Sequence, residues 1–127
     1  MTILIYARNG TDTEERLRQV LGPWALDKNI QWCKTIPSFI TRLCRPLSEP
    51  VVALLVAADE RDLMGILSCR HLLQEMRLVL ILPDRDSKMV AAAHKLHPRY
   101  LAYRDDDARE IGAVLERMLA GSGLVFA

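Results

Sequence analysis

The sequence has few cysteines, and their arrangement excludes two common kinds of stabilising site. Its 127 residues include Cys33, Cys44 and Cys69, which are widely spaced and form no CxxC pair. An odd number of scattered cysteines argues against a disulfide framework and against a structural zinc site. This cysteine usage fits a reducing compartment, and we therefore expect a cytoplasmic location.

Long hydrophobic runs and an excess of either charge are also missing. The longest apolar run, Val51 to Ala58, is far shorter than the roughly 20 residues that a membrane span requires. Met1 to Tyr6 is apolar but has neither the basic region nor the cleavage site of a signal peptide. Seventeen Lys and Arg nearly balance sixteen Asp and Glu, which predicts no general attraction to nucleic acid. We expect a soluble protein with no membrane or nucleic-acid partner.

The familiar catalytic motifs are missing as well. No P-loop, GxGxxG run or Ser/His/Asp arrangement is present, so hydrolase, nucleotide-binding and dehydrogenase functions have no motif to support them. His71, His94 and His97 are expected on two different helices, as surface residues. The acidic runs Asp84–Asp86 and Asp105–Asp107 precede helices, where negative charge is favourable. We expect no enzymatic activity, no metal ion and no cofactor.

What the sequence does contain is a regular alternation of strand and helix patterns. Apolar or alternating runs predict five strands: Ile3–Ala7, Ile30–Thr35, Val51–Ala58, Leu78–Leu82 and Tyr100–Tyr103. Helix-type spacing predicts a helix after each strand, beginning near Thr11, Pro37, Asp59, Ser87 and Asp107. The third helix is expected to be long, reaching Gln74, and the last to stop at Gly121–Gly123.

This alternation predicts an α/β fold. Parallel strands need crossover connections, and those are right-handed, so we expect a three-layer, doubly wound, five-stranded parallel sheet of order 2-1-3-4-5. The length suits one domain over residues 1–127, and with no linker at either end we expect a stand-alone chain. Ligands of such sheets bind beyond the carboxyl ends of the strands, near the switch point between strands one and three.

The order and spacing of these elements resemble response-regulator receiver domains, which have the flavodoxin-like fold, over nearly the whole chain. Receivers end the first strand with an acidic pair that holds Mg²⁺, and Ala7 and Arg8 stand at those positions here. They end the third strand with the acceptor Asp, followed eight residues later by Gly. Val51 to Gly65 fits that frame with Ala57 at the acceptor position.

The remaining signature positions of the family have also changed. The hydroxyl residue after the fourth strand falls near Pro83, and the Lys near the end of the fifth falls at Tyr103. Phosphoryl transfer there needs a nucleophilic carboxylate, a metal and a cation, and none is present in register. The resemblance therefore implies a degenerate pseudo-receiver: a phosphorylation-independent protein-interaction domain of bacterial signalling or regulation.

The same resemblance implies an interaction face. In receivers the fourth helix, the fifth strand and the fifth helix commonly mediate partner binding or dimerisation. We expect a protein partner or a homodimer through this face, which here carries Tyr100, Tyr103, Arg104 and Arg109. Tyr103 and Arg104 are the favoured contacts, because aromatic and Arg side chains are enriched at binding hot spots.

Two alternatives remain open at the switch point. Asp59, two residues beyond the acceptor position, is either a shifted nucleophile or a helix N-cap. Arg8 is either a solvated loop residue or a fixed cation that neutralises Asp59 or Asp84. The run from Asn9 to Glu14 also resembles the phosphate loop of flavodoxins, so the second functional hypothesis is a small FMN-binding or other small-ligand protein.

Overall fold

The computed structural model describes residues 2–8, 10–22, 29–45 and 51–123, and these form a five-stranded sheet flanked by helices. The strands are β1 (Thr2–Tyr6), β2 (Asn29–Cys33), β3 (Val51–Val56), β4 (Arg77–Leu82) and β5 (Tyr100–Tyr103). The helices are α1 (Asp12–Leu21), α2 (Ile36–Leu43), α3 (Glu60–Ser68), α4 (Ser87–His94) and α5 (Ala108–Gly123), with a short 3₁₀ helix, η2 (Arg70–Leu72).

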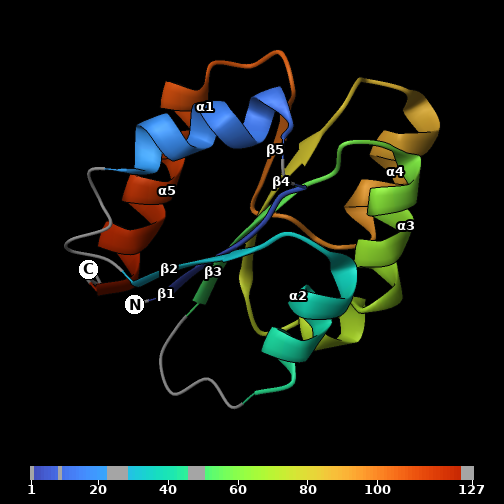
Figure 1. Ribbon diagram of the computed structural model, residues 1–127, viewed down its shortest axis with the longest axis horizontal. Coiled ribbons are helices and arrows are strands. Elements are labelled where there is room, and N and C mark those ends of the chain that lie inside the picture. The colour runs from blue at the N-terminus through green and yellow to red at the C-terminus, as the bar shows by residue number, and fades with distance from the viewer. Residues whose placement is uncertain (1, 9, 23–28, 46–50, 124–127) are drawn as a thin grey trace.

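The sheet is parallel throughout, in the order β2-β1-β3-β4-β5. Helices α1 and α5 cover one face, and α2, α3 and α4 cover the other (Figure 1). The predicted fold class and strand order are therefore confirmed. Because β1 lies between β2 and β3, the chain reverses direction across the sheet at β1 and β3, which is the switch point.

Strand periodicity divides the core into two layers. Alternate residues of β3 point to opposite faces, so Ala53 and Leu55 pack with Phe39 and Leu63 on the side of α2, α3 and α4. Val52, Leu54 and Val56 pack instead against α1 and α5. β3 is buried along its whole length, as expected for a parallel strand covered on both faces.

The helix starts follow local capping chemistry. The Thr35 hydroxyl accepts from the Ser38 amide, and the Ser38 hydroxyl accepts from the Thr35 amide, which forms a capping box ahead of Pro37 in the first turn of α2. Helix α1 ends at Leu21 with Gly22 as its C-cap. The capping box fixes where α2 leaves the carboxyl edge of the sheet, and the C-cap fixes where α1 ends.

The predicted length of the third helix is wrong. Helix α3 ends at Ser68, and Cys69 leaves the helical region with φ −113° and ψ 20° before η2 continues the turn. Leu73 is nevertheless buried, so apolar spacing marked burial without marking an unbroken helix. Helix α5 ends at Gly123, within the Gly121–Gly123 segment where the sequence predicted its end.

Candidate functional site

The candidate site lies where β1 and β3 end side by side. Tyr6 is opposite Leu55 in the register, the Ala7 amide donates to the carbonyl of Cys33 (3.0 Å), and the Ala57 amide donates to that of Ile81 (2.9 Å). Both alanines are buried. The two positions that the resemblance assigns to a metal-binding acid and to the acceptor therefore carry methyl groups within the core.

Arg8 follows directly and forms ion pairs across the switch point. Its Nη2 donates to Asp59 Oδ2 at 3.0 Å, and its Nε donates to Asp62 Oδ1 at 2.9 Å. The hypothesis that Arg8 is a fixed cation beside Asp59 agrees with this geometry, whereas the ion pairs of Arg8 in the described residues do not include Asp84. A guanidinium can bind two carboxylates at once because its donors form a planar fork.

Asp62 is the central acceptor of this cluster. From the sequence alone it is only an acid near the start of a helix. Its side chain is buried and accepts from Tyr6 Oη (2.9 Å), Arg8 Nε (2.9 Å) and the Ala58 amide (2.9 Å). Three donors satisfy a carboxylate that would otherwise be costly to bury. An acid in the first turn after a buried strand, with Arg and Tyr ending the neighbouring strand, is the only signal the sequence carried.

Asp59 has a structural role in the same cluster. Its Oδ1 accepts from the Asp62 amide at 2.9 Å, which makes Asp59 the N-cap of α3, as one of the two alternatives expected. This backbone hydrogen bond is the main reason that the pKa of Asp59 lies below its ordinary value, and Arg8 lowers it further. Asp59 is therefore held as a carboxylate with both oxygens in use.

The pKa values of Tyr6 and Arg8, the remaining members of the cluster, are raised by their surroundings. Burial, followed by the hydrogen bond to Asp62, raises the pKa of Tyr6 to about 12, so the phenol stays a donor. Hydrogen bonding to Asp62 likewise raises the pKa of Arg8 above its ordinary value. We call Tyr6, Arg8, Asp59 and Asp62 the switch-point cluster.

The loop between β1 and α1 is organised by its own hydrogen bonds. Gly10 has φ +85°, a conformation that side chains disfavour, and Asn9 lies outside the described residues. The Thr11 hydroxyl accepts from the Glu14 amide and so caps α1. The Glu14 carboxylate accepts from the Gly10 amide rather than from the Thr11 amide. Glu14 also pairs with Arg18, which lowers its pKa. These bonds make α1 begin where it does and account for Thr11 and Glu14 by helix capping.

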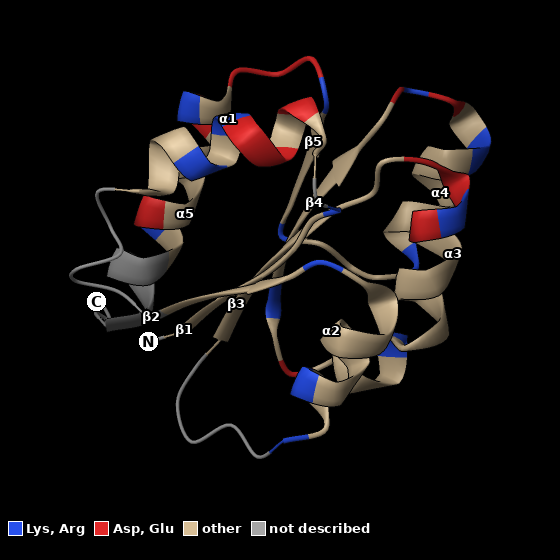
Figure 2. Ribbon diagram, in the orientation of Figure 1, with Lys and Arg blue, Asp and Glu red and all other residues tan. Residues whose placement is uncertain are grey.

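The acidic runs belong to loops at the carboxyl edge, seen at the top of Figure 2. Asp86 is the N-cap of α4, and the Tyr103 amide donates to Asp106 (2.9 Å). Arg85 pairs with Asp105 and Asp106, and its guanidinium lies 4.2 Å from the centre of the Tyr103 ring. In the parts of the chain that the structure describes, no three His, Cys, Asp or Glu side chains form a group that could hold a metal ion.

The residues predicted for the interaction face are spread over two sides of β5. Tyr100 packs against the layer of α1 and α5, and Tyr103 packs against the layer of α4. Arg104 is exposed beyond the strand end, and Arg109 is 86% exposed and paired with Asp107. Pro83, at the family's hydroxyl position, is partly exposed ahead of α4. Tyr103 and Arg104 thus remain neighbours at one corner of the sheet.

A pocket of about 270 Å³ lies beside the switch-point cluster. Its floor includes Ala57, Ala58 and Ile81, and Thr11 and Arg104 stand at its rim. The small side chains at the end of β3 leave this space open. Its lining combines an apolar floor with one cation, Arg104, and one carboxylate, Asp12, which is the chemistry of a site for a small ligand with both apolar and polar groups.

Gly65, which fits the receiver pattern, has a packing role here. A Cβ at this position would lie 2.9 Å from Cγ1 of Ile36, so only glycine lets α3 approach the start of α2 this closely. The residue is therefore explained by helix packing alone.

Comparisons with known proteins agree with this architecture. No family model matches the chain, and no curated protein matches it. Among solved structures it is similar to a response regulator receiver protein from Pseudoalteromonas atlantica, with a TM-score of 0.73 at 13% identity over 96% of this chain and 99% of that one. A CheY-like receiver domain protein from Methanospirillum hungatei JF-1 gives 0.71 at 12% identity, over 94% and 93%.

A response regulator from Thermotoga maritima is a third similar structure, with a TM-score of 0.68 at 12% identity over 94% of this chain and 98% of that one. At such low identity these likenesses establish the fold, which is that of receiver domains. None of the described helices is both long and apolar enough to cross a membrane.

Proposed function

We propose that this chain is a receiver-fold protein-interaction domain of a signalling or regulatory system, non-enzymatic and independent of phosphorylation. One observation carries the proposal: Arg8 binds Asp59 and Asp62 at the place where receivers hold a metal ion. A guanidinium supplies one permanent positive charge where Mg²⁺ would bring two. Within the cluster, Arg8 and the Tyr6 hydroxyl already donate to the two carboxylates.

The absence of a nucleophile in register supports the same conclusion. Ala57 has no oxygen to phosphorylate, and the nearest carboxylate beyond it, Asp59, is bound by Arg8 and by the Asp62 amide. A hydrogen-bonded carboxylate is a weaker nucleophile than a free one, because its donors withdraw electron density from the oxygens. Both oxygens of Asp59 are already accepting hydrogen bonds.

Phosphorylation is tested by incubating the protein with acetyl phosphate and Mg²⁺ and measuring the intact mass. We expect no phosphoryl adduct, while a phosphorylatable receiver treated in parallel gains one. An adduct that hydroxylamine removes, and that is missing from the D59N variant, would establish Asp59 as a nucleophile and overturn the proposal.

Partner binding is proposed at the corner formed by Tyr103 and Arg104. A half-buried ring stacked with Arg85 and an exposed guanidinium beside it form a surface of the composition found at hot spots. Y103A and R104A should each weaken association with a co-purified partner, or self-association in sedimentation velocity, by about tenfold or more. R45A changes an exposed arginine beyond the end of α2, on the far side of the sheet from β5, and should bind as the wild type does. Unchanged affinity of Y103A and R104A would refute the choice of corner.

The pocket beside the switch point favours a second candidate function, binding of a small polar ligand between Arg104 and Asp12. Its volume of about 270 Å³ lies at the low end for ligand sites, which favours a ligand smaller than FMN. The absorbance spectrum and native mass of the purified protein test it. A flavin spectrum or a bound metabolite would replace the interaction-domain proposal, whereas an unliganded mass would leave it in place.

A further inference from the structure

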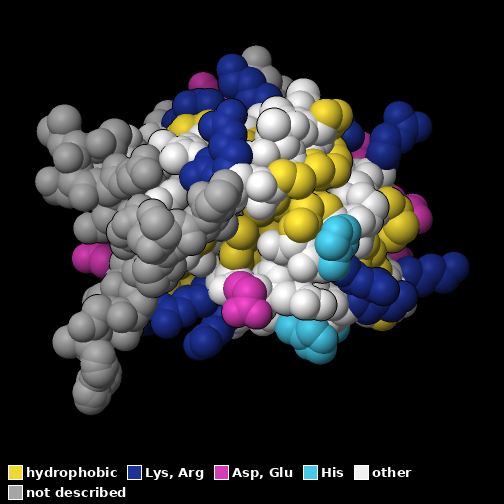
Figure 3. Space-filling view, turned by 90° about the horizontal axis from the view of Figure 1, so that it is seen from below, with side chains coloured by type: hydrophobic (Ala, Val, Ile, Leu, Met, Phe, Trp, Pro, Cys, Tyr) yellow, Lys and Arg dark blue, Asp and Glu magenta, His cyan; other side chains and the backbone are white. Residues whose placement is uncertain are grey.

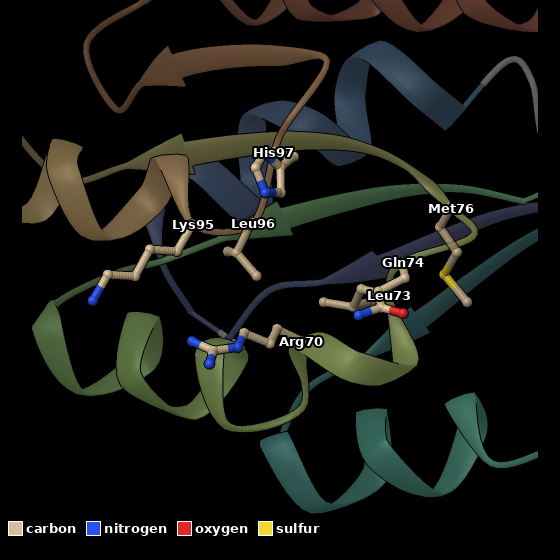
Figure 4. Close-up of a pocket in the computed structure, with 7 residues that line it drawn as sticks. All are labelled: Arg70, Leu73, Gln74, Met76, Lys95, Leu96 and His97. Atoms are coloured by element: carbon tan, nitrogen blue, oxygen red, sulfur yellow. The ribbon is translucent and has the colours of Figure 1, made fainter.

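A groove runs between the end of α3 with η2 on one side and the end of α4 on the other. Three adjoining pockets of about 300, 560 and 610 Å³ make it up, and all three are lined by Arg70 and Lys95. Figure 4 shows Arg70 on one wall and Lys95, Leu96 and His97 on the other. It lies apart from the switch-point cluster, whose residues line none of these pockets.

The rim of this groove is cationic. All three histidines of the sequence line it: His71 beside Arg70, and His94 and His97 beside Lys95. Each of these five side chains is exposed. Within the described parts of the chain, Arg70 and Lys95 form no ion pair, and no Asp or Glu lines any of the three pockets.

The floor of the groove is apolar. Leu67 and Met64 line one pocket, and Leu73, Met76 and Leu96 line the next. Met64 is 47% exposed, the one large hydrophobic side chain that is so exposed among the described residues. Figure 3, which views the molecule from below, shows histidine, Lys and Arg side chains beside an apolar surface. Methionine is common at adaptable binding surfaces because its side chain is flexible.

We propose that this groove binds an acidic peptide segment of a partner protein, with aliphatic side chains of the segment on the floor and its carboxylates against Arg70 and Lys95. Charge complementarity carries the choice, because Arg70 and Lys95 form no ion pair with the described residues and are exposed to carboxylates of a partner. The apolar floor favours a peptide over nucleic acid, whose phosphates would use the rim and leave the floor empty. Imidazoles add further hydrogen-bond donors or acceptors along the segment.

This groove is a surface additional to the corner at Tyr103 and Arg104. Its occupant is tested by selecting a phage-displayed library of random peptides on the intact protein. We expect enrichment of peptides in which Asp or Glu alternates with Leu, Ile, Met or Phe. A fluorescein-labelled copy of an enriched peptide then gives the affinity by anisotropy, and its affinity should fall as salt is added, because the charges are exposed.

Charge-reversal variants locate the binding. R70E/K95E should bind the enriched peptide about tenfold to a hundredfold more weakly, and M64S about tenfold more weakly. R61E/K88E is the matched control, because it makes the same change in net charge at the opposite ends of α3 and α4. The control should bind as the wild type does, and circular dichroism should be the same for all variants.

Three results would overturn the inference. They are a selection without acidic enrichment, equal binding by R70E/K95E and the wild type, and tighter binding of a labelled single-stranded DNA of the same length than of the peptide. Loss of the peptide in Y103A or R104A alone would place it at the other corner instead. The phosphorylation result and the effects of Y103A and R104A on a partner do not depend on these outcomes, so the two proposals fail separately.

Discussion

The two charged regions of this molecule use the same residue types in opposite ways. At the switch point, Arg8 is bound by Asp59 and Asp62, and nearby Arg85 is bound by Asp105 and Asp106. In the groove, Arg70 and Lys95 stand beside three histidines with no carboxylate among the lining residues. In the first arrangement the cations are paired within the chain, and only the Arg8 pair with Asp62 is buried on its acid side. In the second, the cations have no carboxylate among the groove's lining residues. The comparison separates cations whose anion lies in the described chain from cations that we propose to be available to a partner.

The largest effect is expected from D62A, which tests the stabilising half of the comparison. The substitution leaves the Tyr6 hydroxyl, the Arg8 guanidinium and the Ala58 amide without their acceptor in a buried place. Loss of a buried, charged acceptor costs about 3 kcal/mol. Urea denaturation followed by circular dichroism measures the free energy of unfolding.

D105A is the control for that measurement, because Asp105 also pairs with an arginine but its side chain is 72% exposed. An exposed ion pair contributes less than about 1 kcal/mol, so this variant should unfold close to the wild type. Similar losses in D62A and D105A would contradict the distinction between a buried cluster and a solvated pair.

The fold could be read from the sequence because burial imposes simple periods. Val51 to Val56 is apolar at every position, as only a strand covered on both faces is, and this placed β3 at the centre. The length of α3 could not be read, because Leu73 keeps helical spacing while the backbone has already changed to η2.

The site was predicted in part. A contact between Arg8 and Asp59 was one of the alternatives left open, because both residues follow strands that end at the switch point. Asp62 was missed, because its contacts depend on the position of the Tyr6 hydroxyl, 56 residues away, which no local pattern encodes. The gathering of His71 with His94 and His97 in one groove also follows from the packing of two helices rather than from spacing.

A pH titration of Tyr6 tests the buried part of the switch-point cluster. The pKa of Tyr6 is raised to about 12 in the folded protein, against about 10 for an unfolded tyrosine. The folded state therefore binds this proton more tightly, and the resulting stability, about 3 kcal/mol, is fully present below pH 10 and lost as the pH rises through 12. Absorbance titration of the phenolate should show one late step that Y6F removes, and a Tyr6 step near 10 would show that neither burial nor the hydrogen bond to Asp62 raises its pKa.

The smallest effect is expected in the groove, and it decides the other half of the comparison. R70A and K95A remove exposed cations that make no ion pair with the described residues. Each should therefore change the free energy of unfolding by no more than about 0.5 kcal/mol. A loss of stability as large as that of D62A would mean that these cations have a structural anion within the chain. Unchanged stability combined with lost peptide binding would show that Arg70 and Lys95 act in binding. A side chain that contributes nothing to the stability of its own fold can use its whole charge to bind a partner.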